Sequence, residues 1–268
     1  MANAAMRQEM PLTSSSPRIA HTLTGATTGP VVCFVPGFGM PRQAWQAQVA
    51  ALQRTHRILS YDHRGTGMSE VADVPTTMAD IVGDLERLLD HAGIESCRLV
   101  ALSFGGRVAQ AFAARHPSRV ERLVLVSSAR HHDERAPTSQ ALDDLASLDA
   151  VTWRAELAPL LFGTRFLAQE ARRVHVLSLG QTRRPPDPAG LRRLREADLS
   201  FQPPRPGDLG MPTLVIHGSD DRLVPLAAAR RLAEGIPGSR LEILDETGHS
   251  PHLESPAELN TLLTDFLR

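Results

Sequence analysis

Short apolar runs alternate with segments at helical spacing along most of the chain, and this alternation constrains the fold more than any other feature. The runs have the length and continuous apolar character of strands buried on both faces of a sheet, and they lie at 31–37, 97–102, 120–128 and 212–218. Segments between them, such as 77–93 and 104–115, carry apolar residues at helical spacing. An order of strand, helix and strand favours a mostly parallel, twisted sheet with helices on both faces. We therefore predict an α/β fold.

Residues 129–208 break this alternation. They contain helical patches joined by proline-rich turns such as "RRPPDP" and "QPPRPGD", and no convincing strand. Insertions at strand ends commonly form lids over a site. We predict a disordered N-terminus at 1–9, a core formed by 10–128 and 209–268, and a helical cap or lid at 129–208, inserted after the sixth strand of the fold.

Composition and charge exclude several classes of protein. The 268 residues are 42% hydrophobic and 22% charged, and a net charge of −1 gives no field to attract nucleic acid or an anionic membrane. All 29 basic residues are arginine, and the absence of lysine excludes Schiff-base chemistry and a lysine-dependent phosphate loop. No segment approaches the roughly 20 apolar residues of a membrane span. We expect Cys33 and Cys97 to be free, buried thiols, as in a protein of a reducing compartment. We expect a cytoplasmic monomer or homodimer with a small-molecule substrate and no nucleic-acid or membrane partner.

The stretch "RLVALSFGGRVAQAF" (98–112) places a serine between a predicted buried strand and a predicted helix. This junction requires a sharp reversal of the chain, for which Gly105 and the small Ala101 leave room. Such a turn exposes the Ser103 hydroxyl at the carboxyl end of the sheet. It also directs the first amides of the helix to the same place, where they stabilise negative charge. The alternative reading of these residues alone is an ordinary helix N-cap serine.

Five segments resemble motifs of one family, and they occur in that family's order. They are "FVPGFGM" (34–40), "DHRGTGMS" (62–69), "ALSFGG" (101–106), "HGSDDRLVP" (217–225) and "GHSPHLESP" (248–256). On these motifs the chain resembles the α/β-hydrolase superfamily, and within it the compact esterase, lactonase and C–C-bond hydrolase branch. Two positions depart from the pattern. Pro36 replaces the histidine that usually braces the oxyanion turn, and Ala101 replaces the first glycine of the nucleophile elbow.

The resemblance implies catalytic roles for residues of these motifs. Ser103 is the expected nucleophile, His249 its general base, and Asp221 the carboxylate that orients the imidazole. The backbone N–H groups of Phe38 and Phe104 are the expected oxyanion donors. No cofactor and no metal are implied.

Neighbouring residues of the same chemical types leave alternatives open. Asp220 is adjacent to Asp221 and chemically equal to it, so it is the alternative partner of the histidine. His252 is three residues from the predicted base and is expected to face a helix or solvent. Asp62 and Arg64 resemble the family's loop-bracing pair, and a catalytic role for Asp62 is the alternative.

The predicted lid carries further candidates. Its apolar underside is expected to bind the substrate through Trp153, Leu157 and Phe162, among neighbouring leucines. Many arginines lie between 165 and 195 with few acidic residues nearby. They form either a clamp for the carboxylate of an acidic substrate or the solvent-exposed face of helices. Three residues at the predicted lid entrance are of types that bind metals: His131, His132 and Asp133. A solvated entrance is the better interpretation, because adjacent histidines seldom reach one ion with good geometry.

These expectations combine into one reaction class. The resemblance implies a serine hydrolase that cleaves a carboxylic ester, lactone or related acyl bond of a small, partly apolar molecule through an acyl-enzyme. One alternative is a C–C-bond hydrolase, acyltransferase or lyase that uses the same residues. Another is a catalytically silent protein that only binds a small molecule.

Overall fold

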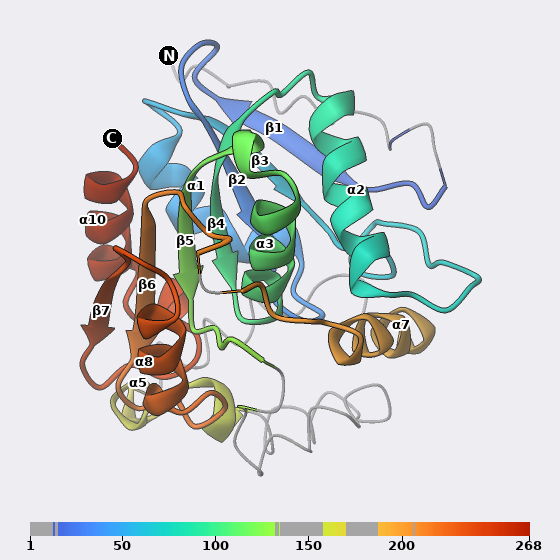
Figure 1. Cartoon of the computed structure of the whole chain (residues 1–268). Coiled ribbons are helices and arrows are strands. Elements are labelled where there is room, and N and C mark those ends of the chain that lie inside the picture. Colours follow the sequence, from blue (N-terminus) through green and yellow to red (C-terminus); the bar gives the residue numbers. More distant parts are fainter. Residues whose placement is uncertain (1–12, 14–15, 132–133, 135–157, 170–186, 206) are drawn as a thin grey trace.

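A computed structural model of the protein describes residues 13, 16–131, 134, 158–169, 187–205 and 207–268, and within them it shows one seven-stranded sheet (Figure 1). The strand order is β1-β3-β2-β4-β5-β6-β7. Only β1 is antiparallel to its neighbour, and all other pairs are parallel. The predicted α/β fold is therefore confirmed. The strands are β1 (His21–Gly25), β2 (Val31–Val35), β3 (Arg57–Tyr61), β4 (Cys97–Leu102), β5 (Val120–Val126), β6 (Thr213–Gly218) and β7 (Arg240–Leu244).

Helices cover both faces of this sheet, as Figure 1 shows. Alternate residues of the central strands point into two separate apolar cores. One core lies beneath α2 (Met78–His91), α3 (Phe104–Arg115) and α8 (Leu226–Glu234). The other lies beneath α1 (Gln46–Leu52), which follows the short helix η1 (Arg42–Trp45), and α10 (Pro256–Phe266). Two short helices complete this layer structure, η2 (Pro117–Arg119) and α9 (Pro251–Glu254).

The helix α2 illustrates how the sequence fixes an element. A capping box starts it, in which the Thr77 side chain accepts from the Asp80 amide and the Asp80 carboxylate accepts from the Thr77 amide. Its buried positions, including Ile81, Leu85 and Leu88, recur at helical spacing and face the first core. Gly93 follows with a positive φ of 64°, which is the usual end signal of a helix.

The described helices of the insertion lie at the edge of the sheet where the parallel strands end (Figure 1). The insertion follows β5, the fifth strand in chain order, whereas the prediction placed it after the sixth strand of the fold. The described chain forms one strand fewer before it. Its described elements are α5 (Thr164–Ala168) and α7 (Pro188–Leu199), together with helical residues 158–161.

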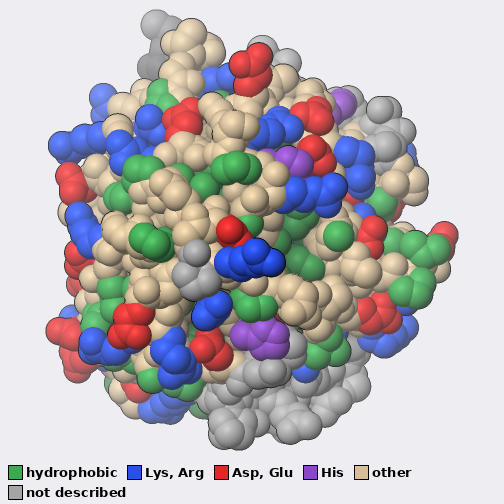
Figure 2. All heavy atoms as spheres, in the orientation of Figure 1, with side chains coloured by type: hydrophobic (Ala, Val, Ile, Leu, Met, Phe, Trp, Pro, Cys, Tyr) green, Lys and Arg blue, Asp and Glu red, His purple; other side chains and the backbone are tan. Residues whose placement is uncertain are grey.

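The surface carries both signs of charge. Figure 2 shows arginine and acidic side chains interspersed over the face that bears α2 and α3. Among the described residues, no helix has both the length and the apolar character needed to cross a membrane.

Candidate active site

Three of the predicted site residues lie on loops at one edge of the sheet. Ser103 directly follows β4, Asp221 follows β6, and His249 follows β7. These strands are parallel, with β5 between β4 and β6, so their carboxyl ends point the same way. The topology thus brings together segments that are far apart in the sequence.

The Ser103 turn makes the sharp reversal that the sequence predicts, and its backbone is strained. Its φ of 53° and ψ of −115° lie outside the regions that a serine ordinarily adopts. Gly105 is required because a Cβ there would overlap the carbonyl oxygen of Pro36, and a Cβ at Gly106 would overlap the Ser128 hydroxyl. Ser103 occupies the N-cap position of α3, yet its side chain makes no capping hydrogen bond. The hydroxyl therefore remains available for another role.

The Ala101 departure leaves the strand regular. Ala101 is fully buried in β4 and pairs in register with Val35 on one side and Leu125 on the other. The added methyl is accommodated within the core.

Asp221 and His249 form a buried pair. The Asp221 carboxylate accepts a hydrogen bond from His249 Nδ1 at 2.8 Å. Its other oxygen accepts from the amides of Leu223 and Val224 at 2.9 and 2.8 Å, which fixes its orientation. A carboxylate only accepts, so Nδ1 carries hydrogen and Nε2 of the neutral ring is free to accept a proton.

Asp220, the alternative partner, makes different contacts. Its Oδ2 accepts from the amide and hydroxyl of Thr164 at 2.7 and 2.8 Å. These hydrogen bonds lower the pKa of Asp220. The two adjacent aspartates thus face different parts of the molecule.

The Ser103 hydroxyl and His249 make no hydrogen bond in the described structure. Bonds between a nucleophile and its base are often long before the substrate binds and shorten in the complex. The assignment of Ser103 as nucleophile consequently stays a prediction.

The expected oxyanion donors flank the serine turn. Phe104 is the first residue of α3, where amides have no partner within the helix. Phe38 lies in the turn after β2, and its ring meets the Phe104 ring edge to face at 6.1 Å between centroids.

A buried carboxylate that the sequence analysis gave no role holds the histidine loop. Glu254 accepts from the amides of Gly163, Gly248 and Ser250 at 2.7, 3.0 and 3.0 Å. Burial raises the pKa of Glu254, while these three hydrogen bonds oppose the rise. Two of the amides belong to the residues on either side of His249, so Glu254 fixes the backbone of the predicted base. The only sequence signal for it is its place in the "GHSPHLESP" motif.

Two further histidines lie near this pair. His217 donates from Nε2 to the Val224 carbonyl at 2.8 Å and lies 3.4 Å from Asp221, and burial lowers its pKa. His252 is buried, with its ring 5.3 Å from that of Trp45, and burial lowers its pKa to about 3. Of the two expected environments, a helix or solvent, the structure shows the first: α9 turns the side chain inward against Trp45 of η1.

Asp62 and Arg64 brace the second motif through separate partners and not through each other. Asp62 accepts from the amide and guanidinium of Arg42 at 2.7 and 2.5 Å. Arg64 donates two hydrogen bonds to Asp84 on α2, at 2.5 and 2.8 Å. The Arg64–Asp84 contact is buried and the Arg42–Asp62 contact is partly buried, and both tie the turn to neighbouring elements, which is a bracing function.

The remaining predicted residues are only partly described. Trp153, Leu157, His132 and Asp133 lie outside the described residues, whereas Phe162 is buried and stacks on Phe166 at 4.8 Å. No cluster of metal-binding side chains occurs within the described ranges. Three arginines of the expected clamp have carboxylate partners within the protein, in the pairs Arg165–Glu246, Arg193–Glu196 and Arg195–Asp198.

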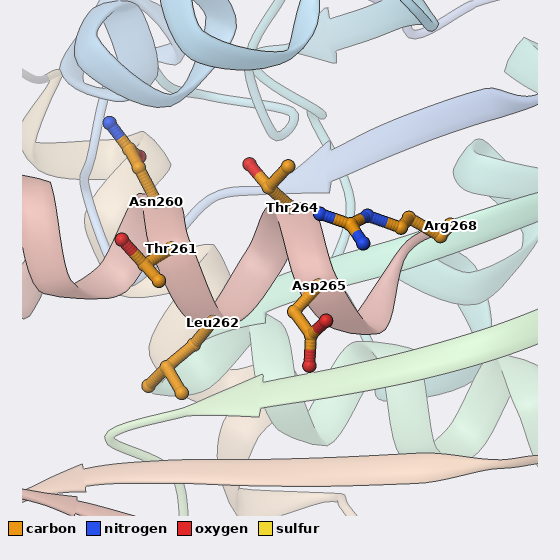
Figure 3. A pocket seen from close by; sticks show the side chains of 6 residues that line it. All are labelled: Asn260, Thr261, Leu262, Thr264, Asp265 and Arg268. Atoms are coloured by element: carbon orange, nitrogen blue, oxygen red, sulfur yellow. The ribbon is translucent and has the colours of Figure 1, made fainter.

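A separate hollow lies on α10 (Figure 3). All of its lining residues come from this helix or the residues directly after it; they are Asn260, Thr261, Leu262, Thr264, Asp265 and Arg268. Because α10 covers the face of the sheet opposite α3, this hollow is distinct from the strand edge that carries the predicted site.

Comparisons with known proteins support the family. The sequence model of the α/β hydrolase fold matches residues 30–256. A protein of Variovorax paradoxus named as a carbamate hydrolase, RutD, is 34% identical, and the match covers 92% of this chain and 95% of the relative. A pimeloyl-[acyl-carrier protein] methyl ester esterase of Aromatoleum aromaticum is 31% identical, with 89% and 98% covered.

A solved structure agrees with these relatives. The enol-lactonase from Burkholderia xenovorans LB400 superposes with a TM-score of 0.85 at 25% identity, covering 96% of this chain and 99% of that one. With the strand order, the loops at the sheet edge and the named relatives together, the chain belongs to the α/β hydrolase fold family and is a hydrolase.

Proposed function

We propose that this hydrolase cleaves a carboxylic ester, lactone or related acyl bond of a small, partly apolar molecule with Ser103 as nucleophile. The observation that carries the proposal is the buried hydrogen bond between Asp221 and His249 Nδ1, at the sheet edge that also carries the strained Ser103 turn. The relatives named as a carbamate hydrolase, an ester hydrolase and an enol-lactonase all cleave a bond to an acyl carbon, which supports the same reaction class. No cofactor enters the proposal.

The reaction proceeds in two steps, acylation of Ser103 and hydrolysis of the acyl-enzyme. His249 Nε2 takes the hydroxyl proton as Ser103 Oγ attacks the carbonyl carbon, and the amides of Phe38 and Phe104 stabilise the resulting oxyanion. Collapse of this intermediate expels the leaving group, which takes the proton from His249. Water then attacks the acyl-enzyme with His249 again as base, and the acid product leaves as Ser103 regains its proton.

A substrate panel tests the proposal. Wild type and Ser103→Ala are assayed on p-nitrophenyl esters, simple lactones, acyl thioesters and an aryl carbamate, with the exposed Ser118→Ala as matched control. We expect turnover of at least one class by wild type and Ser118→Ala, and loss of about 10³-fold or more in Ser103→Ala. Undiminished turnover in Ser103→Ala would overturn the proposed nucleophile. No turnover in wild type would favour C–C-bond or biosynthetic chemistry.

A further inference from the structure

His63 contacts the oxyanion turn at the residue where the chain departs from its family pattern. His63 follows β3, is 1% exposed, and its Nε2 lies 3.0 Å from the carbonyl oxygen of Pro36. A carbonyl oxygen only accepts, so Nε2 carries the hydrogen and donates it. Pro36 itself has no N–H group to donate. Its carbonyl is held from outside the turn, two residues before the Phe38 amide.

The same imidazole also contacts the other half of the predicted oxyanion hole. Its ring meets the Phe104 ring edge to face at 5.2 Å, and it also meets the Tyr61 ring edge to face at 5.1 Å. Phe104 in turn meets Phe38 edge to face. Tyr61, His63, Phe104 and Phe38 thus form a continuous series of edge-to-face rings, which we call the aromatic ladder.

The Pro36 carbonyl is the point where the two turns meet. It lies so close to Gly105 that a Cβ there would overlap it, which means that the start of α3 packs directly on the end of β2. The hydrogen bond from His63 therefore fixes an oxygen that touches the turn of Phe38 and the turn of Phe104 at once. Burial lowers the pKa of His63 to about 4, so the ring is neutral near pH 7.

We propose that His63 is a positioning residue that sets the spacing between the Phe38 and Phe104 amides through its hydrogen bond to Pro36 and its contact with Phe104. The inference rests on the proposed function, because these amides matter only if an oxyanion forms between them. A residue of this kind stabilises the transition state more than the bound substrate, and its loss lowers kcat while KM changes little.

Two matched variants separate the hydrogen bond from the packing. His63→Gln keeps an N–H donor that can reach the Pro36 carbonyl, whereas His63→Phe keeps the aromatic ladder but removes the donor. For each variant we would measure kcat, KM and the inhibition constant of a boronic acid, whose tetrahedral adduct with the serine mimics the oxyanion. Thermal unfolding reports whether each variant folds.

We expect kcat of His63→Phe to fall about tenfold or more, but by less than the 10²–10³-fold loss caused by removal of an oxyanion donor. The boronic acid should weaken by a similar factor, KM should stay within about twofold, and His63→Gln should retain most of kcat. Equal kcat and boronic acid affinity in wild type and folded His63→Phe, which lacks the donor to the Pro36 carbonyl, would overturn the inference. If wild type does not bind the boronic acid at all, the proposed function fails instead, and the two failures are thereby distinguished.

Discussion

The described segments of the insertion contact the core at two places that differ in chemistry. On one side α7 packs against the turn of the second motif and against α3; on the other, residues 162–168 pack against the loops of Asp221 and His249. Figure 1 shows α7 and α5 at opposite ends of the same sheet edge. The difference between the two sides indicates which movements of the insertion would displace Asp221 and His249, the predicted acid–base pair.

The α7 side is held by a buried ion pair and by a close backbone contact. Arg107 of α3 donates two hydrogen bonds to Asp198 of α7, at 2.6 and 3.0 Å, and both side chains are buried. A Cβ at either Gly65 or Gly190 would overlap the backbone of the other residue. These contacts join α7 to α3, the helix that follows the predicted nucleophile, and they do not involve the loop of His249.

The other side is held mainly through backbone amides. Glu254 joins the amide of Gly163 to those around His249, and Asp220 accepts from Thr164. Gly163 and Gly248 lie so close that a Cβ on either would overlap the other segment. A shift of this segment would therefore move the backbone around the predicted base directly, whereas a shift of α7 would act on α3 and on the stability of the fold.

The largest expected effect on kcat distinguishes the adjacent residues Asp220 and Asp221. Asp221→Asn replaces the acceptor of His249 Nδ1–H by a group that favours the wrong tautomer, and we expect kcat to fall on the order of 10⁴-fold. Asp220→Asn only weakens a contact with Thr164, and a change within about threefold is expected. Steady-state kinetics on the best substrate of the panel compares them, and equal losses in the two variants would contradict the assignment of Asp221.

Breaking the ion pair of the α7 side should mainly destabilise the fold. Arg107→Met leaves Asp198 charged and buried with, among the described residues, only the longer contact to Arg195 at 3.7 Å, which we expect to cost about 3 kcal/mol in the free energy of unfolding, the lower end for a broken buried pair. The double variant Arg107→Met with Asp198→Leu should recover most of this loss, and exposed Arg115→Met on the same helix serves as control. Urea unfolding measures all three. A double variant as unstable as Arg107→Met would show that the charge on Asp198 is not the cause.

Weakening the other side should change activity as well as stability. Glu254→Gln retains one acceptor oxygen but turns an NH₂ group toward amide donors, at a cost of about 1.5–3 kcal/mol for a charge-assisted hydrogen bond. Because two of the donors flank His249, we also expect kcat to fall about tenfold at temperatures where the variant is folded. Exposed Glu258→Gln of α10 should match wild type. A loss of stability with unchanged kcat would place Glu254 in the fold alone.

The effect that is smallest near neutral pH concerns acid stability. The pKa of His252 is about 3 in the folded protein and about 6.5 in an unfolded chain. Between these values the unfolded chain holds a proton that the folded protein lacks. The free energy of unfolding therefore falls by about 1.4 kcal/mol for each pH unit of acidification. His252→Phe keeps a ring against Trp45 and removes this term.

Urea unfolding at several pH values between 6 and 4 checks the sign. The slope of the free energy of unfolding against pH should be shallower by about 1 kcal/mol per pH unit in His252→Phe. Identical slopes in wild type and His252→Phe would show that His252 does not titrate as its burial implies.

The sequence predicts what depends on local pattern and on order along the chain. The strands around 31–35 and 97–102, the helix at 104–115 and the strained turn at Ser103 all follow from apolar runs and small residues at fixed spacing. The same reasoning cannot supply partners that lie far away in the chain. Asp62 meets Arg42 across 20 residues, and Arg107 meets Asp198 across 91.

The sequence also did not predict which polar residues are buried. His63 and His252 are almost fully buried, and their orientation depends on which neighbour each element packs against, namely Phe104 and Trp45. Glu254 belongs to a recognised motif, but the amides that it accepts from become neighbours only when the insertion is docked. No local periodicity carries that information.

Covalent labelling of the serine tests the central claim most directly. Wild type is treated with a fluorophosphonate probe, and the modified residue is located by peptide mass spectrometry. We expect a single adduct on Ser103, no adduct in Ser103→Ala, and labelling at least 10²-fold slower in His249→Ala. An unlabelled wild type, or an adduct that persists in Ser103→Ala on neighbouring Ser127 or Ser128, would contradict the account.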